Sequence, residues 1–436
     1  MNNACKESLA ILGGEPIRKK TWPKWPKATL AMEKELLQAL HSGRWAISGA
    51  YTGKVCHERK FAEAFAEYNG AKYCIPTING TSALLLALLA LGVGPGDEVL
   101  VPGVTWVACA SVVTTLEAIP ILVDVDSKTL TMSLEQARKA ITPKTKAFML
   151  VHLYGSVGYL DEFLNLSKEM NIPIIEDCAQ AHGTCWDNKR VGTFGHVGCF
   201  SMQQSKLLTS GEGGAVITND SKLASLIEQL RSDGRLFRNN PEIGRLELIE
   251  VGEIQGHNMC LSEFQSAILL GGLKSLDEEN MIRQERANLL SKLLKEIGIE
   301  PLEFDKKVTF PTYYNYVFKC NLKDFANNSI DSISRALSLE LNANINPIYK
   351  PLNNHPLYCP TRSSRVKNSE TRNALDPKRF SLPNGEVARS TYLTLHHSLL
   401  LDDEESMYDI VRALKKVMEN SPELLRTTQE ASNVAF

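Results

Sequence analysis

The stretch YCIPTINGTSALLLALLALGVGPGDEVLVPG, residues 73–103, carries two short apolar runs with a longer apolar segment between them. Short apolar runs bounded by turn residues are typical of buried strands, and the longer segment has the length of a helix. This stretch therefore predicts a strand, a helix and a second strand.

The same alternation continues as far as Cys178. DEVLVPG precedes WVACASVVTTLEA, IPILVDV precedes SLEQARKAI, KAFMLVHLYG precedes LDEFLNLSKEM, and IPIIEDC ends the series. Repeated units of this kind predict an α/β fold, with a mostly parallel sheet between two layers of helices. Ligands bind such sheets at the carboxyl ends of the strands, so the residues directly after each run are candidates for a functional site.

The rest of the chain predicts a second, smaller domain. Between residues 261 and 298 apolar residues recur at helical spacing, with a kink expected at Gly271-Gly272, and this long helix is expected to connect the two domains. We place the boundary near residue 276. Residues 1–275 then form a large domain with an N-terminal arm, and residues 276–436 form a small α+β domain.

The composition argues against several classes of protein. The 436 residues carry a formal net charge of −2 without a basic block, which argues against a nucleic-acid partner. Ten cysteines are scattered without C-x-x-C pairs or zinc-ligand spacing, so we expect reduced thiols and no metal. Without a signal-like N-terminus or an apolar stretch of about 18 residues, we expect a cytoplasmic protein that does not enter a membrane.

Three candidate residues follow the first predicted strand, in TINGTSALLLALLALG (residues 77–92). Gly80 allows close approach of the backbone, and Thr81 and Ser82 lie in the first turn of an apolar helix. Free N–H groups and hydroxyls at a helix N-terminus bind anions, which suits a phosphate. Simple capping of the helix also explains these residues and, taken alone, is the more common role for Ser and Thr at a helix start.

Two further candidates lie at other strand ends. In IIEDCAQAHG (residues 174–183), Asp177 ends a buried run, where a carboxylate needs a cationic partner such as a protonated ring nitrogen, an arginine or a helix N-terminus. Trp106 follows VPGVT and is expected either to stack on a flat ring or to belong to the core.

Lys206 lies in CFSMQQSKLLTSGEGGAVITND (residues 199–220), between two strand-like runs. An isolated lysine before a turn is most often a surface charge. A sheltered lysine, however, has a lowered pKa and becomes a nucleophile. A phosphate site, a stacking aromatic ring, a carboxylate and an amine together fit pyridoxal phosphate.

Several segments resemble one known family. They are LGGEPIRKKTWPKWP, NGTSALLLAL, EDCAQAHG, FSMQQSKLLTSGEGG, GHNMCLSEFQSAIL and the late LHHSLLL. These segments are similar to the DegT/DnrJ/StrS family of sugar and cyclitol aminotransferases, and within it to the glutamine-dependent enzymes that aminate scyllo-inosose and 2-deoxy-scyllo-inosose. The resemblance implies the aspartate aminotransferase fold (fold type I), with a seven-stranded sheet in the large domain.

The resemblance also implies roles for individual residues. Lys206 matches the lysine that forms a Schiff base with pyridoxal 5′-phosphate, Asp177 the acid paired with the pyridine nitrogen, and Gln180 the residue beside the phenolic oxygen. The remaining matches are Gly80, Thr81, Ser82 and Ser201 at the phosphate, Trp106 on the ring, and Asn258, which reaches the cofactor of a partner subunit in a homodimer. His182, His396 and His397 are candidate substrate contacts, although a lone histidine is more often structural.

The function that follows is transfer of the amino group of L-glutamine, or glutamate, to a keto-cyclitol or keto-sugar in aminoglycoside-like biosynthesis. Family dehydratases carry histidine in place of the lysine, so Lys206 favours transamination. The alternatives are a nucleotide-linked keto-sugar aminotransferase, a 3-amino-5-hydroxybenzoate-type synthase and a non-enzymatic, cofactor-binding regulatory protein. A dinucleotide-dependent oxidoreductase is disfavoured because no G-x-G-x-x-G follows an early strand.

Overall fold

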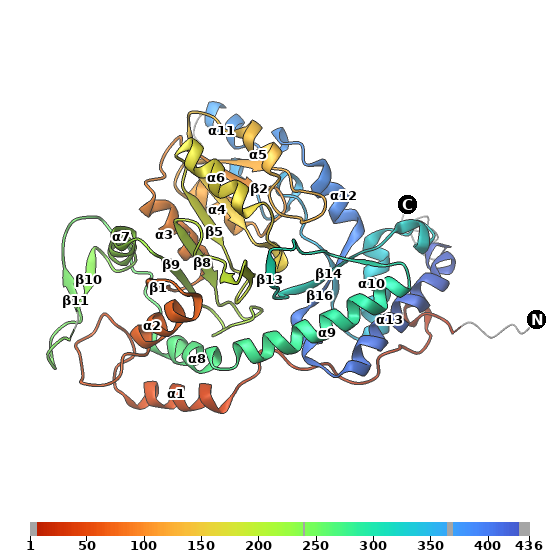
Figure 1. Ribbon diagram of the computed structural model, residues 1–436, viewed down its shortest axis with the longest axis horizontal. Coiled ribbons are helices and arrows are strands. Elements are labelled where there is room, and N and C mark those ends of the chain that lie inside the picture. The colour runs from red at the N-terminus through yellow and green to blue at the C-terminus, as the bar shows by residue number, and fades with distance from the viewer. Residues whose placement is uncertain (1–6, 239, 364–368, 427–436) are drawn as a thin grey trace, which may run out of the picture.

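The computed structural model describes residues 7–238, 240–363 and 369–426 (Figure 1). Its centre is a seven-stranded sheet in the order β1, β9, β8, β5, β4, β2, β3. The strands are β1 (Tyr73–Thr77), β9 (Gly214–Thr218), β8 (Val197–Ser201), β5 (Ile174–Asp177), β4 (Thr145–Val151), β2 (Glu98–Pro102) and β3 (Ile119–Val123). Only β9 runs antiparallel to its neighbours, so the predicted mostly parallel, seven-stranded sheet is confirmed.

Helices cover both faces of this sheet (Figure 1). One face packs against α3 (Gly80–Ala90), α4 (Ala108–Thr115) and α7 (Ser221–Arg231). The other packs against α2 (His57–Asn69), α5 (Leu134–Ala140), α6 (Leu160–Met170) and α8 (Glu263–Leu273). The strands alternate between the two cores: Val99 and Val101 belong to the first cluster, whereas Leu100 belongs to the second. Burial on both faces explains why these strands are continuous apolar runs.

The second sheet is antiparallel and has four strands, in the order β12, β14, β16, β15. These are β12 (Glu300–Pro301), β14 (Asn315–Lys319), β16 (Tyr392–His396) and β15 (Ile345–Pro347). Their core is shared with α9 (Leu276–Glu296), α10 (Ile330–Leu341) and α13 (Glu404–Glu419). We call this sheet and its helices the small unit; the predicted division of the chain into two domains near residue 276 stays a prediction.

The N-terminal arm packs against this smaller unit. Leu9 is completely buried in its core, and the backbone N–H of Ala10 donates to Glu340. Arg18 forms ion pairs with Asp402 and Asp409 at 2.6 and 2.9 Å. The arm then continues past the large domain to α1 (Leu30–His41).

The long helix predicted over residues 261–298 is two helices, α8 and α9, separated by Lys274 and Ser275. The two glycines lie inside the last turn of α8 rather than at the break. A Cβ on Gly271 would lie 2.6 Å from the backbone of Met32, so this glycine lets α1 pack closely on α8. The glycine pair thus serves helix packing, and the chain turns two residues later.

The other elements connect these layers, η marking short 3-10 helices. They are η1 (Ala10–Leu12), η2 (Leu153–Gly155), β6 (Cys185–Trp186), β7 (Lys189–Arg190), β10 (Arg235–Phe237), β11 (Leu248–Glu250), β13 (Val308–Phe310), η3 (Leu322–Phe325), η4 (Leu352–Asn354), η5 (Pro360–Arg362), α11 (Ser369–Leu375), η6 (Pro377–Arg379), α12 (Pro383–Thr391) and η7 (His397–Leu401). Of the helices in the described ranges, none combines the length and apolar character needed to cross a membrane.

Candidate functional site

A cavity of about 610 Å³ opens at the carboxyl ends of the parallel strands, where the sequence predicts the site. Seven of the predicted residues line it: Gly80, Thr81, Trp106, Asp177, Gln180, Ser201 and Lys206. Further lining residues, not predicted, include Thr105, Cys109, Gln203, Ser205, Glu212, Tyr314 and Tyr349. Ser82, Asn258 and the three predicted histidines lie outside this lining.

The N-terminus of α3 lines the cavity and is its candidate anion site. Asn79 caps this helix, because its side-chain oxygen accepts a hydrogen bond from the N–H of Ser82 at 2.8 Å. The first-turn N–H groups of Gly80 and Thr81 have no partner within the helix, and both residues line the cavity. A Cβ on Gly80 would lie 2.6 Å from the Cβ of Ser201, so only glycine brings the turn this close to β8. Ser82 is buried beneath the turn.

Asp177 is buried at the end of β5, with 6% of its surface exposed. Its Oδ1 accepts the N–H of Ala179 at 3.0 Å, and its Oδ2 accepts the thiol of Cys109 at 3.1 Å. Burial raises the pKa of Cys109 well above its usual range, which keeps the thiol protonated as a donor. Within the described ranges Asp177 forms no ion pair, so a buried carboxylate faces the cavity without a cation beside it.

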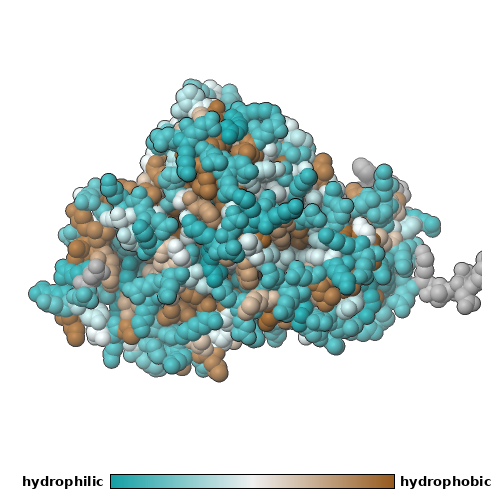
Figure 2. Space-filling view, in the orientation of Figure 1, coloured by the Kyte–Doolittle hydropathy of each residue, from teal (hydrophilic) through white to brown (hydrophobic). Residues whose placement is uncertain are grey.

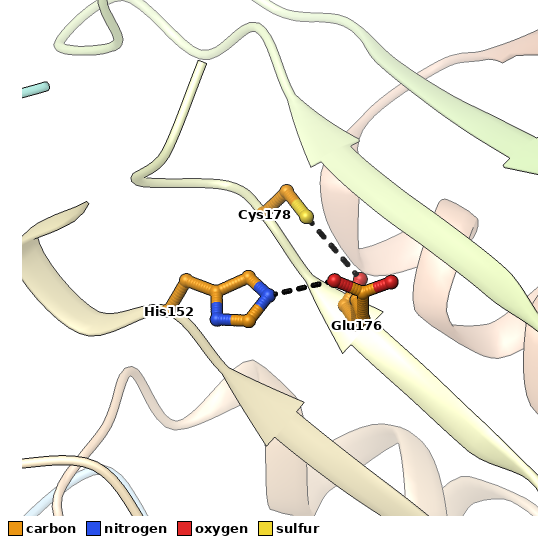
Figure 3. A group of neighbouring side chains, drawn as sticks. All are labelled: His152, Glu176 and Cys178. Atoms are coloured by element: carbon orange, nitrogen blue, oxygen red, sulfur yellow. Dashed lines mark hydrogen bonds and ion pairs between the residues drawn. The ribbon is translucent and has the colours of Figure 1, made fainter. Parts of the chain in front are cut away.

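The neighbouring Glu176 points to a different set of partners (Figure 3). One oxygen of its carboxylate lies 2.9 Å from His152 Nε2 and accepts the N–H of Gly192, and the other accepts the N–H groups of Phe194 and Gly195. Burial alone would raise the pKa of Glu176, but His152 and these N–H groups outweigh it and leave the pKa below its usual range.

Together with Cys178, these two side chains are the one described group of His, Cys and acidic residues close enough to share a metal ion. The carboxylate of Glu176 is already surrounded by four hydrogen-bonding groups, however. The group therefore serves to tie residues 192–195 to the strand that carries Asp177.

Gln180 connects the large domain to a tyrosine that the sequence did not indicate. Its side-chain oxygen accepts the N–H of Tyr154 at 2.9 Å, and its side-chain nitrogen lies 3.3 Å from the hydroxyl of Tyr349. The ring of Tyr349 lies 5.9 Å from that of Trp106, which is 47% exposed at the cavity mouth. Burial raises the pKa of Tyr349 well above its usual range, so its hydroxyl stays protonated.

The Lys206 amine lies 4.3 Å from the ring centre of Tyr314, over its face. The hydroxyl of the same tyrosine lies 2.9 Å from Ser205 Oγ, one residue before the lysine. The N–H of Lys206 donates to the carbonyl of Gln203 at 2.8 Å, which closes the turn on which the amine stands. Tyr314 and Tyr349 come from the far part of the chain, and neither belongs to a motif that local sequence reveals.

The three predicted histidines lie behind the lysine turn rather than in the cavity lining. His182 is 1% exposed, and burial and the nearby Lys206 amine lower its pKa to about 3. His397 is completely buried, with Nε2 3.0 Å from the carbonyl of Ser205. His396 is half-buried and pairs with Ser398, and burial lowers its pKa to about 4. Their predicted contact with substrate stays a prediction.

Asn258 lies on an exposed segment, paired with Ser232 by a single β-bridge. The carbonyl of the next residue, Met259, accepts the N–H of Ile78, just before the anion-binding turn. Asn258 therefore lies outside the cavity lining, on a segment that is hydrogen-bonded to the chain just before α3.

Residues 29–391 match the DegT/DnrJ/EryC1/StrS aminotransferase family. The chain is 45% identical over 420 residues to the L-glutamine:2-deoxy-scyllo-inosose aminotransferase of Streptomyces lividus, a match that covers 96% of this chain and 99% of that protein. It is 41% identical to the L-glutamine:scyllo-inosose aminotransferase of Streptomyces griseus, covering 96% and 99%. Among solved structures, 3-amino-5-hydroxybenzoic acid synthase matches with a TM-score of 0.77 and 30% identity, over 92% of this chain and 99% of that chain. The predicted family and fold are thus confirmed.

Proposed function

The chain belongs to the DegT/DnrJ/EryC1/StrS aminotransferase family, and on that premise we propose that it transfers the amino group of L-glutamine to the ketone of a scyllo-inosose-type cyclitol, with pyridoxal 5′-phosphate as cofactor. One observation carries the proposal. The amine of Lys206 and the carboxylate of Asp177 line the same cavity as the N-terminus of α3. An amine, an acid and an anion site are the three groups that this cofactor requires.

The residues present fit the cofactor. The buried Asp177 carboxylate has no cationic partner among the described side chains, and a protonated pyridine nitrogen would supply one. The N–H groups of Gly80 and Thr81, with the hydroxyls of Thr81 and Ser201, would hold the phosphate. Trp106 offers a ring for stacking, and Gln180 offers an amide near the ring edge.

When bound, pyridoxal phosphate supplies a protonated ring that accepts the electron pair left by removal of a proton from carbon. Lys206 Nζ takes that proton from the α-carbon of the amino donor, and later returns a proton to the former ketone carbon of the acceptor. Asp177 holds the proton on the ring nitrogen. Tyr314 lies under the lysine amine, with its ring centre 4.3 Å from Nζ, and would limit the positions that Nζ can take.

The charge of the cavity supports a neutral acceptor. Among the described lining residues Lys206 is the one cation, and Glu212 adds a carboxylate beside Asp177. A nucleotide-linked sugar carries a diphosphate, which proteins usually bind with arginine or lysine side chains. A cyclitol needs hydroxyl and amide partners instead, and Gln203, Tyr314 and Tyr349 supply these.

We also propose a homodimer, which would let Asn258 reach the cofactor of a partner subunit, as the family resemblance implies. Large apolar side chains are exposed around α1 and near the β10–β11 hairpin, at the lower left of Figure 2. They include Leu30, Leu37, Leu40, Trp45, Ile243 and Leu246. Exposed apolar residues that gather on one side indicate a protein interface. Asn258 is near the hairpin, because it pairs with Ser232, three residues before β10 begins.

The deciding experiment is a visible spectrum of purified protein, followed by substrate assays. We expect a yellow protein that loses its colour when L-glutamine is added and regains it when scyllo-inosose or 2-deoxy-scyllo-inosose follows. In Lys206→Ala, borohydride treatment should leave no cofactor attached after denaturation. A response only to glutamate and nucleotide-linked keto-sugars would overturn the substrate assignment, and a colourless protein would overturn the cofactor assignment.

A further inference from the structure

Two parts of the chain outside the large domain hold the turn that carries Lys206. The indole N–H of Trp25, in the N-terminal arm, donates to the carbonyl of Gln204 at 3.0 Å. The imidazole Nε2 of His397, after the last strand of the small sheet, lies 3.0 Å from the carbonyl of Ser205. The carbonyls of the two residues directly before the lysine are therefore both bound, Gln204 by the N-terminal arm and Ser205 by the small unit.

The two side chains also contact each other. The ring centres of Trp25 and His397 are 4.6 Å apart, and the rings meet edge to face at 84°. Arg283, on α9, lies 5.3 Å from the centre of the indole. The arm, the small unit and the connecting helix thus meet at one point behind the lysine turn.

The hydrogen-bond partner of His397 shows which ring nitrogen carries the proton. A carbonyl only accepts, so Nε2 carries the proton and donates it to Ser205. Burial lowers the pKa of His397 well below its usual range, and the facing Arg283, His396 and His182 add to this effect. The ring is therefore neutral, and its only hydrogen bond among the described residues goes to the lysine turn.

Within the turn itself, few bonds fix the backbone. The N–H groups of Ser205 and Lys206 donate to the side chain and the carbonyl of Gln203, respectively. These bonds shape the turn but do not fix its position relative to the small unit. Contacts from outside the turn do: Tyr314 bonds the side chain of Ser205, whereas Trp25 and His397 bond the backbone itself.

We propose that Trp25 and His397 are positioning residues for Lys206, and that they fix the reach of its amine into the cavity by holding the two preceding carbonyls. The proposal rests on the role that the proposed function gives to Lys206. Displacement of a reacting group by about 1 Å costs up to about 10²-fold in rate. Loosening the turn should therefore lower kcat rather than substrate affinity.

Trp22 provides a matched control for Trp25. It lies in the same arm and is half-buried, and its indole N–H also donates to a carbonyl, that of Leu341 at 2.7 Å. This bond ties the arm to the small unit away from the lysine turn. Trp25→Phe and Trp22→Phe each remove one indole N–H from the arm, but only the first releases Gln204.

For the histidine, His397→Leu removes the donor, whereas His397→Gln keeps an N–H of similar reach. Each variant is first measured without cofactor, by hydrogen–deuterium exchange of the peptide that spans residues 202–210. With cofactor bound, we measure kcat, KM and the pH midpoint of the visible absorption band. The exchange measurement needs no cofactor, so it reports how firmly the turn is held even if the proposed cofactor assignment is wrong.

In Trp25→Phe and His397→Leu we expect faster amide hydrogen exchange over residues 202–210. We also expect kcat to fall about 10- to 100-fold, KM to stay within about threefold of the wild type, and the pH midpoint of the absorption band to shift. Trp22→Phe should match the wild type in hydrogen exchange, kcat, KM and the pH midpoint. His397→Gln should keep most of the kcat that His397→Leu loses. If Trp25→Phe exchanges and reacts like Trp22→Phe, the proposal is wrong. This pair decides the question even if His397→Leu does not fold.

Discussion

The thiol of Cys109 points at Asp177, with Sγ 3.1 Å from Oδ2, and it is the only side-chain donor to this carboxylate among the described residues. Thr105 Oγ1 lies 3.3 Å from the same sulfur. A residue of α4 thus sets the orientation of the acid at the end of β5.

Removal of this thiol should weaken catalysis. Cys109→Ala leaves Asp177 with one hydrogen bond, from the N–H of Ala179. A hydrogen bond to a charged group contributes about 1.5 kcal/mol or more, so we expect kcat to fall about tenfold. Cys109→Ser keeps a donor and should stay within about threefold of the wild type. Equal activity of the alanine and serine variants would show that the thiol does not orient the acid.

Neutralising the carboxylate of Asp177 itself should lower kcat further than removal of the Cys109 thiol. Asp177→Asn keeps the shape of the side chain but removes the charge that would hold a proton on the cofactor ring. We expect kcat to fall about 10²- to 10³-fold, as when a preorganised electrostatic group is lost. Asp331→Asn, which breaks an exposed pair with Arg389, serves as the control and should react normally. A steady-state assay with L-glutamine gives both values.

The approach of α3 to β8 predicts a defect in cofactor binding. In Gly80→Ala the new Cβ would lie 2.6 Å from Ser201 Cβ and 3.1 Å from its Cα, so the anion-binding turn must move. We expect cofactor affinity to fall about tenfold or more, because the N–H groups lose their alignment. In Gly94→Ala the Cβ meets nothing within 4 Å, and affinity should not change. Titration of cofactor-free protein measures both.

A buried ion network behind the site predicts a large effect on stability. Arg231 is completely buried and pairs with Glu58 at 2.6 Å and with Glu228 at 2.7 Å. Arg231→Met leaves both carboxylates without this partner, and we expect the free energy of unfolding to fall by about 3–5 kcal/mol.

An exposed ion pair provides the comparison. Arg138 is 47% exposed and pairs with Glu169, which is 59% exposed. Arg138→Met should change the free energy of unfolding by less than about 1 kcal/mol. Urea unfolding with one spectroscopic probe measures both variants, and similar losses in the two would contradict the role given to the network.

His182 predicts how stability changes with acid. Its pKa is about 3 in the folded protein, against an ordinary value near 6.5, so between these values the unfolded chain binds a proton that the folded chain does not. The contribution of neutral His182 to the free energy of unfolding is complete above pH 6.5. As the pH falls below this value, the free energy of unfolding decreases by about 1.4 kcal/mol per pH unit. From pH 6.5 to 5 we expect a loss of about 2 kcal/mol from this residue.

His182→Phe tests this, because the new ring keeps the edge-to-face contact with Phe200. Urea unfolding at several pH values should give a shallower decline for this variant than for the wild type. His396 and His397 have lowered pKa values too and should leave part of the decline in place. An identical decline in both proteins would show that His182 is not the group that titrates.

Much of the fold was predictable because its signals are local. The run YCIPT coincides with β1, and LDEFLNLSKEM coincides with α6, since turn residues mark the ends of both. Asp177 is predicted by the rule that ligands bind at strand ends, and Lys206 by its place in a turn between two strand-like runs. The kink expected at Gly271-Gly272 was misplaced because the glycines accommodate a neighbouring helix, which only the tertiary packing reveals.

The residues that contact the site from distant segments were less predictable, because only the tertiary packing brings them to it. Tyr314 and Tyr349 reach the cavity from the small unit, and no motif surrounds either of them. His397 drew attention as a possible substrate contact, whereas the structure shows it bonded to a backbone carbonyl. Trp25 lies in an arm whose path past the large domain depends on packing between distant segments.

The hydrogen bond from His397 has a consequence for the order in which the protein is made. The histidine follows Ser205 by 192 residues, so a ribosome finishes the entire large sheet long before this donor leaves the exit tunnel. Domains generally fold from the N-terminus during synthesis. The strands around the cavity are therefore in place while the lysine turn still lacks its last hydrogen bond. Competence to bind the cofactor firmly should arise only near the end of translation, and chains that terminate before residue 397 should fold their sheet without acquiring it.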